Sequence, residues 1–549
     1  MEDTGLIPTG IAGLDEILLG GIKQGNILMV EGAPGTGKTT LGLEFIYRGA
    51  IEYDEPGLVI SFELSPQKLM RDAQGFGWEF ERLERDGKLR VIYTSPMVLL
   101  QELHSHDGLL MSEVDRLGAK RLLIDGLTPL RLFGELFNNR PFRDSLHLLV
   151  ESMQRKGLTA IMTREAPANE MARASEFAHE QFVCDTCMVL RAEPRGRSIQ
   201  RSIEISKSRG QDYITGRHTL RIEGDRGIRV YRRAQARPRT VEPQPTSTER
   251  SSLGVAAVDE MIGKGVYDGS VTLVVGVSGT GKTVLGAQFL VEGARQGRRG
   301  LLISLDEHPA QIMRNAKGLG LDLEPHVADG SVMVHYESPQ ELELDVHFDT
   351  IIRMIDEHRI ERVVIDSLAA YYVNEANERE FRDYIYALAT SLKDRLVTVF
   401  MNYESPELLG ISQISKELNA SIIVDNIILL NYVEFSNRLR RAITVPKARG
   451  SAPHRSTREY TITTGGIQLL PETVSTRDDG QSVPQLPFSS YLGVLARSPA
   501  RSSPLIDSAM SEVALDGLDV GAEEHRQNSR PMNGEQKNGA AGQNGHAPE

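Results

Sequence analysis

The chain contains two copies of one long sequence pattern, and this duplication constrains its fold more than any other feature. The segment GLIPTGIAGLDEILLGGIKQGNILMVEGAPGTGKTTLGLEF near the N-terminus reappears from residue 250 as RSSLGVAAVDEMIGKGVYDGSVTLVVGVSGTGKTVLGAQF. Four pairs of matching positions are 244 residues apart: Gly10 and Gly254, Asp15 and Asp259, Gly32 and Gly276, Lys38 and Lys282. Downstream, LLID ending at Asp125 matches VVID ending at Asp366, and SKSRG matches PKARG. Landmarks that keep one order indicate a duplicated domain.

The duplication divides the chain into two lobes, a linker and a tail. A chain of 549 residues is too long for one hydrophobic core. We predict a first domain at residues 1–233, a proline-rich polar linker at 234–250 and a second domain at 251–474. Residues 475–549 are rich in Ser, Pro, Gly, Asn and Gln, and they cannot bury enough apolar surface to offset the chain entropy lost on folding. We therefore predict a disordered tail.

Short apolar runs alternate with amphipathic segments in each lobe. In the first lobe the runs NILMVEG, GLVISF, KRLLID and LTAIMT lack the polar alternation of half-exposed strands, which indicates strands buried on both faces. The segment TTLGLEFIYRGAIEY, between the first two runs, is amphipathic. Buried strands interleaved with helices predict an α/β fold with a mostly parallel sheet in each lobe.

Composition and charge argue against several classes of protein. The formal net charge of −13 argues against a protein that coats nucleic acid or an anionic membrane. No apolar stretch approaches the roughly 20 residues that span a bilayer. The N-terminal MEDTGLIPTG lacks the basic start and apolar core of a signal peptide. We therefore expect a cytoplasmic protein without a membrane partner.

The two cysteines of the chain, Cys184 and Cys187, have the C-x-x-C spacing of a redox or zinc motif. Their context, FVCDTCMVL, is an apolar run that predicts a strand rather than the start of a helix. A structural zinc site needs four ligands, and the sequence offers no second cysteine pair. We expect two small buried residues.

Two P-loops carry the strongest functional motif. GAPGTGKT and GVSGTGKT both fit G-x-x-x-x-G-K-[ST], and each follows an apolar strand and opens a helix. Backbone amides of such a loop surround phosphate oxygens, and the helix N-terminus adds a favourable dipole. The predicted nucleotide-binding residues are Gly32, Ala33, Pro34, Gly35, Thr36, Gly37, Lys38 and Thr39, and Gly276, Val277, Ser278, Gly279, Thr280, Gly281, Lys282 and Thr283. We expect ATP and Mg²⁺ as cofactors, with the lysines near the β- and γ-phosphates.

Four side chains are predicted to hold the magnesium ion. The hydroxyl groups of Thr39 and Thr283 would ligate it directly. Asp125 and Asp366 each end an apolar strand about 85 positions after the P-loop. A carboxylate at that place supports the Mg²⁺ shell as a Walker B aspartate.

A carboxylate also ends the next predicted strand after each P-loop. ISFELSPQ contains Glu63, and the matching ISLDEHPA contains Asp306 and Glu307. Transfer of phosphate to water or a hydroxyl needs a group that orients or deprotonates the nucleophile, and a carboxylate suits that role. The same carboxylate could instead cap the helix that starts near Ser65 or His308. The residues alone leave both interpretations open.

Taken together, these motifs resemble the KaiC family of RecA-like ATPases. The resemblance covers about residues 5 to 470. It rests on GIAGLDEILLGGI, both P-loops, EYDEPGLVISFELSPQ, AQGFGWEF, NAKGLGLDL, both Walker B strands, DNIILLNYVE and both K-x-R-G hairpins. It implies two tandem RecA-like domains, ATP bound between neighbouring subunits and a homohexameric double ring.

The resemblance also implies roles for the strand-end carboxylates. In the family two consecutive glutamates follow this strand, and the first is the catalytic base. Glu63 falls on the first position and Leu64 replaces the second, whereas Asp306 and Glu307 take the two positions in the second lobe. Aspartate is one methylene shorter than glutamate, so the resemblance leaves open which second-lobe carboxylate is the base.

Two further sets of residues take roles from the resemblance. Lysine and arginine of the family's K-x-R-G hairpin reach the neighbouring subunit's γ-phosphate, and they match Lys207, Arg209, Lys447 and Arg449. The family's circadian-clock member phosphorylates an adjacent Ser-Thr pair in its second domain. Ser421 falls on the serine and Ile422 replaces the threonine. Single-site autophosphorylation at Ser421 therefore stays open, while a two-site cycle is not expected.

Three functions compete at this stage. The first is a KaiC-like ATPase, with Ser/Thr autokinase activity in the second lobe, that signals to protein partners the sequence does not identify. The second is a RecA- or RadA-type DNA-dependent ATPase, favoured by 15 Lys/Arg against 7 Asp/Glu in residues 191–250 but disfavoured by the few aromatic residues there. The third is an ATP-gated scaffold with one inactive ring, suggested by Leu64 or Asp306. We expect the first, without nucleic acid as a partner.

Overall fold

Most of both predicted lobes is described by the structure. The computed structural model describes residues 5–102, 108–137, 142–166, 178–195, 198–235, 245–374, 378–404, 423–435, 438–454, 456–471, 474–476 and 482–484. Ser421, the predicted phosphoacceptor, lies outside these ranges. Among the described residues, no helix combines the length and the apolar character needed to cross a membrane.

The first lobe alternates strands and helices as its sequence predicts. Its described strands are β1 (Leu6–Ile7), β2 (Ile22–Lys23), β3 (Ile27–Gly32), β4 (Gly57–Ser61), β5 (Leu89–Tyr93), β6 (Arg121–Asp125), β7 (Thr159–Glu165), β8 (Thr186–Arg195), β9 (Ser198–Ser208), β10 (Arg217–Glu223) and β11 (Gly227–Tyr231). Its described helices are α1 (Leu14–Ile17), α2 (Lys38–Glu52), α3 (Pro66–Gln74), α4 (Phe80–Arg85), α5 (Pro96–Glu102), α6 (Leu109–Leu117), α7 (Leu127–Phe137), α8 (Phe142–Arg155) and α9 (Ala178–Val183).

The second lobe repeats this order of elements. Its described strands are β12 (Arg250–Ser251), β13 (Val266–Tyr267), β14 (Val271–Gly276), β15 (Gly300–Ser304), β16 (Val332–Tyr336), β17 (Arg362–Asp366), β18 (Thr398–Glu404), β19 (Asn426–Phe435), β20 (Arg438–Ala448), β21 (Arg458–Thr463) and β22 (Gly466–Leu469). Its described helices are α10 (Ala256–Ile262), α11 (Lys282–Arg295), α12 (Pro309–Gly318), α13 (Leu323–Ala328), α14 (Leu344–His358), α15 (Ala369–Asn374) and α16 (Glu378–Lys393).

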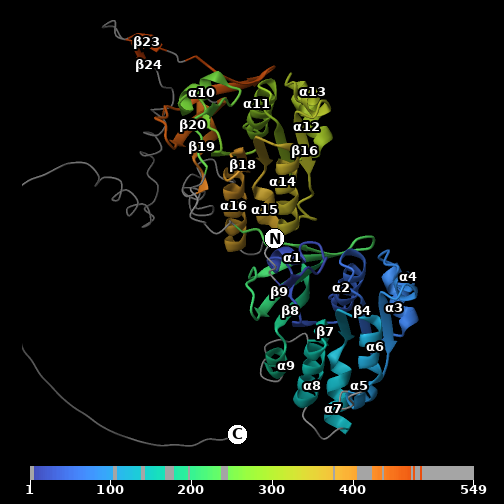
Figure 1. The fold of residues 1–549 in the computed structure, drawn as a ribbon. Helices are drawn as coiled ribbons and strands as arrows, with labels where there is room; N and C mark the ends of the chain where they lie inside the picture. The colour runs from blue at the N-terminus through green and yellow to red at the C-terminus, as the bar shows by residue number, and fades with distance from the viewer. Residues whose placement is uncertain are drawn as a thin grey trace, which may run out of the picture. The chain divides into compact units, whose positions relative to one another are not determined.

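Within the described residues, each lobe contains a nine-stranded sheet with helices around it (Figure 1). The strand order is β11-β10-β9-β8-β3-β7-β6-β4-β5 in the first lobe and β22-β21-β20-β19-β14-β18-β17-β15-β16 in the second. The strands from β8 to β5, and from β19 to β16, are parallel to their neighbours, and the other three of each sheet are antiparallel. Because the two orders match strand for strand, the predicted duplication and mostly parallel sheets are confirmed.

The central strand of each lobe feeds two hydrophobic cores, one on each face of the sheet. In β3, Leu28 and Val30 pack into the core that contains residues of α2, α3 and α4. The alternate residues Ile27 and Met29 pack into the core that contains residues of α5, α6 and α8. Successive strand side chains point to opposite faces, so a strand covered on both faces must be apolar at every position. This explains the unbroken apolar runs of the sequence.

The P-loop strand lies inside its sheet, between two parallel neighbours. β3 is flanked by β7 and β8, and β14 by β18 and β19. All these strands end at the same edge of the sheet, where their following loops meet. Ligands of open α/β sheets bind at this carboxyl edge. The topology therefore brings the P-loop, the Walker B aspartate and the strand-end carboxylate of each lobe to one edge.

Both cysteines are buried, as the sequence predicts. The predicted continuous strand is wrong, however, because α9 ends at Val183 and β8 begins at Thr186. Cys184 lies in the connection and Cys187 in the strand. Burial raises the pKa of the Cys187 thiol to about 11. A thiol of such high pKa is a poor nucleophile and metal ligand at neutral pH.

Two short strands lie at the start of the segment 475–549 that is predicted to be disordered, the first of them beginning one residue before it. β23 (Val474–Thr476) pairs with β24 (Ser482–Pro484). The sequence between them contains Asp479-Gly480, a dipeptide typical of hairpin turns, and both strands contain β-branched residues. The disorder prediction is therefore wrong for these strands, and the rest of the predicted tail lies outside the described residues.

Glu44 on α2 shows how the two lobes occupy one buried position differently. Its side chain is buried, and its Oε2 accepts a hydrogen bond from the Ile228 amide at 2.6 Å. Burial raises the pKa of Glu44 to about 7. Gln288 holds the matching position on α11, where its Oε1 accepts a hydrogen bond from the Ile467 amide at 2.8 Å. The first lobe thus uses a titratable acid where the second uses a neutral amide.

We predict that Glu44→Gln raises the free energy of unfolding of the first lobe by roughly 2 to 3 kcal/mol at pH 8, and by less than about 1 kcal/mol at pH 5. Between the unfolded pKa of 4.5 and the folded pKa of about 7, the native state holds a proton that the unfolded chain has released. Wild-type stability therefore falls as the pH rises through this window. Urea unfolding at both pH values measures the effect, with Glu52→Gln on the same helix as control. An equal gain at both pH values would contradict the explanation.

Candidate functional site

Each P-loop connects the central strand of its lobe to a helix that begins at the P-loop lysine. Gly35 and Gly37 have φ angles of 79° and 104°, and Gly279 and Gly281 have 78° and 98°. Glycine adopts this left-handed backbone without the steric cost that a Cβ would add. The same local conformation therefore recurs in both lobes, which explains why the loop needs glycine at these places.

The P-loop lysines are buried beside the loop carbonyls. Lys38 Nζ donates a hydrogen bond to the Ala33 carbonyl at 3.0 Å. Lys282 Nζ donates to the carbonyls of Gly276 and Val277 at 2.9 and 3.1 Å. Burial lowers the pKa of both lysines, and neighbouring carboxylates oppose that shift. Each loop thus holds a cation where it could neutralise phosphate charge.

A hydroxyl and a carboxylate meet next to each lysine. Thr39 Oγ1 donates to Asp125, 3.1 Å from each carboxylate oxygen, and Thr283 Oγ1 donates to Asp366 Oδ2 at 2.6 Å. Asp125 also accepts a hydrogen bond from Thr163 Oγ1 at 2.6 Å. Burial raises the pKa of both aspartates. Mg²⁺ prefers oxygen ligands and keeps several waters, so this oxygen donor set fits a hydrated magnesium ion.

Glu63 follows β4 and faces the first P-loop. Its side chain is exposed and makes no hydrogen bond to any described residue. Burial, Glu165 and Asp125 raise the pKa of Glu63, while Lys38 opposes the rise. Ser65 is the N-cap of α3, which has no side-chain capping bond. Interpretation of Glu63 as a helix cap is therefore wrong. Its charged neighbours are the P-loop lysine Lys38 and the strand-end carboxylates Glu165 and Asp125.

The two carboxylates of the second lobe have different surroundings. Asp306 is exposed, accepts a hydrogen bond from Ser367 Oγ at 2.7 Å and interacts with Lys282. Glu307 accepts a long hydrogen bond of 3.4 Å from Asn315 Nδ2 on α12. Its pKa is raised by burial and then by Asp366 and Asp306. Asp306 therefore stands toward its P-loop lysine as Glu63 does toward Lys38.

In the second lobe, the N-terminus of α12 is capped by His308. The Nδ1 atom of His308 accepts a hydrogen bond from the Ala310 amide at 3.3 Å at the start of α12. Neither Asp306 nor Glu307 caps this helix, so the capping interpretation is wrong in this lobe as well.

Two site residues were missed by the sequence reasoning. Glu165 ends β7 in register with Gly32, and Glu404 ends β18 in register with Gly276. The Glu404 carboxylate lies 3.8 Å from Lys282 Nζ, and the charge of Glu165 acts on Lys38. Both follow an apolar strand, in MTREAP and MNYESP. This recurrence is the signal that could have identified them.

The hairpin cations lie away from the P-loop of their own lobe. In the sheet register, Lys207 on β9 is opposite Cys187 on β8, and Cys187 is opposite Met29 on β3. Met29 precedes the first P-loop residue, Gly32, by three residues, which is about 10 Å along the strand. Lys207 Nζ donates to the carbonyls of Gln181 and Cys184 at 2.7 and 2.6 Å.

The matching cations repeat this placement. Arg209 Nη2 donates to the Phe182 carbonyl at 2.9 Å, and Lys447 Nζ donates to the Val424 carbonyl at 2.6 Å. Arg449 lies 3.5 Å from the Asp425 carboxylate. All four cations lie toward the amino-terminal ends of the central strands, so the structure does not bring them to their own lobe's P-loop.

The sheet order and the two loops define a tandem RecA-like P-loop ATPase. The family model described as "ATPase: KaiC" matches residues 7–235 and again residues 252–474. The chain therefore belongs to the KaiC family of ATPases.

Similar proteins cover nearly the whole chain. The circadian clock oscillator protein KaiC of Picosynechococcus sp. is 34% identical over 469 residues, covering 84% of this chain and 89% of that protein. The protein of the same name from Thermostichus vulcanus is 32% identical over 524 residues, covering 94% and 96%. That of Synechococcus elongatus is 32% identical over 467 residues, covering 84% and 88%. The likeness spans both lobes.

Proposed function

We propose that each lobe binds and hydrolyses Mg-ATP. The observation that carries this proposal is the contact between a P-loop threonine and a Walker B aspartate beside a buried lysine, which recurs in both lobes. Lys38 and Lys282 would contact the β- and γ-phosphates. Thr39, Asp125, Thr283 and Asp366 would hold the Mg²⁺ shell, and bound Mg²⁺ would neutralise phosphate charge.

Glu63 and Asp306 would orient and deprotonate the attacking water. Both carboxylates are exposed at the carboxyl edge of the sheet and act electrostatically on the P-loop lysine. For Glu63, the raised pKa moves the base closer to the operating pH, which improves proton transfer. Asp306, rather than Glu307, is our choice for the second lobe because its charge acts on the P-loop lysine Lys282, as that of Glu63 acts on Lys38.

The hairpin cations would act on a neighbouring subunit. Lys207, Arg209, Lys447 and Arg449 lie away from their own P-loops, and a cation supplied by a neighbour stabilises the charge of the transferring phosphoryl group. The chain belongs to the KaiC family, and the resemblance to that family implies a homohexamer in which each site would be completed by the next subunit. Hydrolysis would then depend on assembly, which suits a regulatory ATPase with signalling partners.

Nucleotide stoichiometry tests the proposal. The full chain should bind two ATP molecules per protomer in the presence of Mg²⁺, and Lys38→Ala or Lys282→Ala should each remove one. Equilibrium dialysis with radiolabelled ATP measures both values. Binding of two ATP molecules by the double variant, at wild-type affinity, would overturn the assignment of both loops.

The roles of the two second-lobe carboxylates can be distinguished in a Lys38→Ala background, in which the first lobe should not hydrolyse ATP. We predict that Asp306→Asn lowers phosphate release about 10²-fold or more, whereas Glu307→Gln lowers it less than about 10-fold. Steady-state phosphate release at saturating ATP measures the two rates, and ATP binding should stay unchanged. The reverse ranking would identify Glu307 as the base.

Autokinase activity in the second lobe is a second candidate function. It is favoured by identity of 32–34% to the circadian clock oscillator proteins and by the serine at position 421. Phosphopeptide mass spectrometry after incubation with Mg-ATP should detect phosphate at Ser421 in the wild type and none in Lys282→Ala. An unmodified Ser421, or phosphate that survives Lys282→Ala, would reject the autokinase.

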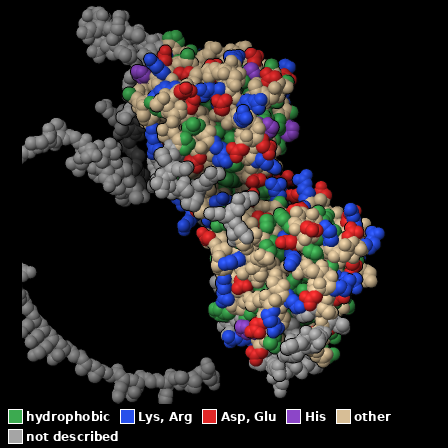
Figure 2. All heavy atoms as spheres, viewed as in Figure 1, with side chains coloured by type: hydrophobic (Ala, Val, Ile, Leu, Met, Phe, Trp, Pro, Cys, Tyr) green, Lys and Arg blue, Asp and Glu red, His purple; other side chains and the backbone are tan. Residues whose placement is uncertain are grey.

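The ATP-gated scaffold with one inactive ring and the DNA-dependent ATPase receive less support. Both lobes keep the lysine, threonine and aspartate geometry, which an inactive ring would not need. On the face shown in Figure 2, Lys and Arg side chains of the described residues are interspersed with Asp and Glu rather than gathered in one basic patch. A DNA-dependent ATPase would need such a patch to track phosphates.

A further inference from the structure

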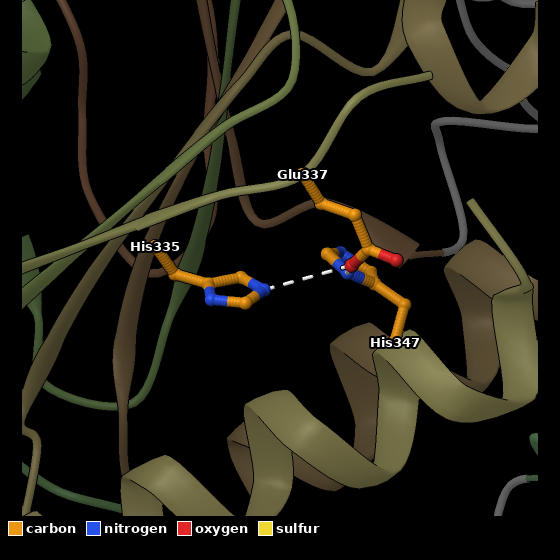
Figure 3. Close-up of side chains that lie close together, drawn as sticks. All are labelled: His335, Glu337 and His347. Carbon is orange, nitrogen blue, oxygen red and sulfur yellow. Dashed lines mark hydrogen bonds and ion pairs between the residues drawn. The ribbon is translucent and has the colours of Figure 1, made fainter. Parts of the chain in front are cut away.

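A cluster of two histidines and one glutamate lies in the second lobe, outside the residues assigned to ATP. His335 and Glu337 come from the end of β16 and the residue after it, and His347 from the first turn of α14. Residues two apart on an extended chain share a face, so His335 and Glu337 point the same way. Figure 3 shows the Glu337 carboxylate between the two imidazole rings.

The geometry of the cluster is close to that of a metal-ligand set. Glu337 Oε2 lies 2.5 Å from His347 Nδ1 and 3.5 Å from His335 Nε2, and one ligand atom from each residue lies within 4.8 Å of the others. Bonds of about 2.1 Å at tetrahedral angles place ligand atoms about 3.4 Å apart. The Glu337–His335 separation already matches this value. The carboxylate must move only about 1 Å from His347 to admit an ion.

The polar atoms of the cluster are prepared for such a ligand. His335 Nε2 is shielded from solvent and makes no hydrogen bond to any described residue. The His347 side chain is fully buried, which lowers its pKa. Burial alone would raise the pKa of Glu337, but both histidines together hold it below its usual value. Imidazole nitrogens and a carboxylate oxygen are donor atoms that bind divalent transition-metal ions.

A second layer of contacts orients the buried histidine. His347 Nε2 lies 2.8 Å from the hydroxyl of Tyr371, which is itself fully buried on α15. When an ion takes Nδ1, the imidazole stays neutral as its proton moves from Nδ1 to Nε2, and Tyr371 accepts the new hydrogen bond. An outer-shell partner on the second ring nitrogen is the usual arrangement around metal-bound histidine.

We propose that His335, Glu337 and His347 form a binding site for a divalent transition-metal ion, with Zn²⁺ the best match. Two nitrogens and one oxygen favour zinc over Mg²⁺, which prefers oxygen ligands alone. The side chains of His335 and Glu337 are 22% and 21% exposed, which leaves room for water as a further ligand. The ion would join the end of β16 to α14, and the contact between His347 and Tyr371 would connect α15 to them. The Glu337 amide donates to Ser304, two residues before Asp306, so the metal site borders the second ATP site without sharing its residues.

The first lobe supplies a matched comparison. His335 pairs with Ile303 as Ile92 pairs with Ile60, and the amides of Glu337 and Thr94 make the same backbone hydrogen bond to the preceding strand. Ile92 and Thr94 therefore take the places of His335 and Glu337. Neither residue supplies the nitrogen or carboxylate ligand, so the site belongs to the second lobe. Replacement by these residues should leave the strand intact, because β5 contains Ile92 and is followed by Thr94 in the same backbone arrangement.

Zinc titration of the chelator-treated full chain, with excess Mg²⁺ to occupy the ATP-linked sites, tests the proposal. We expect one tightly bound Zn²⁺ per chain, and a loss of affinity greater than about 100-fold in His335→Ile and Glu337→Thr. Tyr371→Phe should lose about 10- to 100-fold. His358→Gln, at the other end of α14, should bind as the wild type does.

The visible absorption of Co²⁺ bound in place of Zn²⁺ reports directly on metal coordination. Substitution of residues with a purely structural role would not change it. The wild type should show the visible bands of a four- or five-coordinate ion, and the His335→Ile/Glu337→Thr double variant should not. Circular dichroism and retained ATP binding at Lys282 confirm folding of each variant. Wild-type zinc affinity in the folded double variant, or no zinc binding by the wild type, would overturn the proposal.

Discussion

Glu63→Gln should lower phosphate release from the first lobe about 10²- to 10⁴-fold while leaving ATP binding intact. The measurement uses a Lys282→Ala background, so that the second lobe does not contribute. Glutamine keeps the shape of the side chain but cannot accept a proton from water. The loss should therefore appear in kcat, because Glu63 makes no hydrogen bond that holds the described fold.

The pH dependence of the rate adds a second test of Glu63. Burial and the charges of Glu165 and Asp125 raise its pKa, so the rate should fall with acid at a higher pH than an ordinary carboxylate would give. Glu63→Gln should lack this acid limb. Asp72→Asn on α3, an exposed carboxylate paired with Arg71, should keep both rate and limb. An unchanged rate in Glu63→Gln would reject the base assignment.

Arg209→Ala is expected to have a comparable effect by a different route. In the same Lys282→Ala background, it should lower first-lobe hydrolysis about 10³-fold, as loss of an arginine supplied by a neighbour does. ATP binding by the single protomer should change little, because Arg209 lies away from its own P-loop and donates to Phe182.

Mixing two variants with an inactive first lobe, both in the Lys282→Ala background, distinguishes a neighbour's arginine from a local one. Lys38→Ala lacks a working P-loop but keeps Arg209, whereas Arg209→Ala keeps the P-loop. Assembled together, they should regain part of the wild-type rate, since some sites then combine an intact loop with an intact arginine. Arg217→Ala, which loses an exposed pair with Glu193, is the control and should stay active alone. Failure of the mixture to recover any activity would contradict action between subunits.

Much of the fold could be predicted because its strands are buried on both faces. Such strands appear as unbroken apolar runs, and the duplication showed each landmark twice. The P-loops and Walker B aspartates could be predicted from the sequence because their motifs are local and each occurs twice. In the structure Thr39 contacts Asp125 and Thr283 contacts Asp366, while their roles in binding Mg-ATP stay predictions.

Contacts between distant segments could not be predicted in this way. Glu165 reaches Lys38 only because β7 pairs with β3, a strand order that sequence spacing does not reveal. The histidine cluster depends likewise on the packing of α14 and α15 against the end of β16. The hairpin β23–β24 was missed because composition over a long segment hides a short local pattern.

The most direct test of the central claim is Mg²⁺-dependent phosphate release from ATP by the full chain, the Lys38→Ala and Lys282→Ala variants, and the double variant. We predict that the wild type hydrolyses ATP, that each single variant keeps the contribution of one lobe, and that the double variant falls to background. Hydrolysis by the double variant at the wild-type rate, or a wild type that binds ATP and releases no phosphate, would contradict the account.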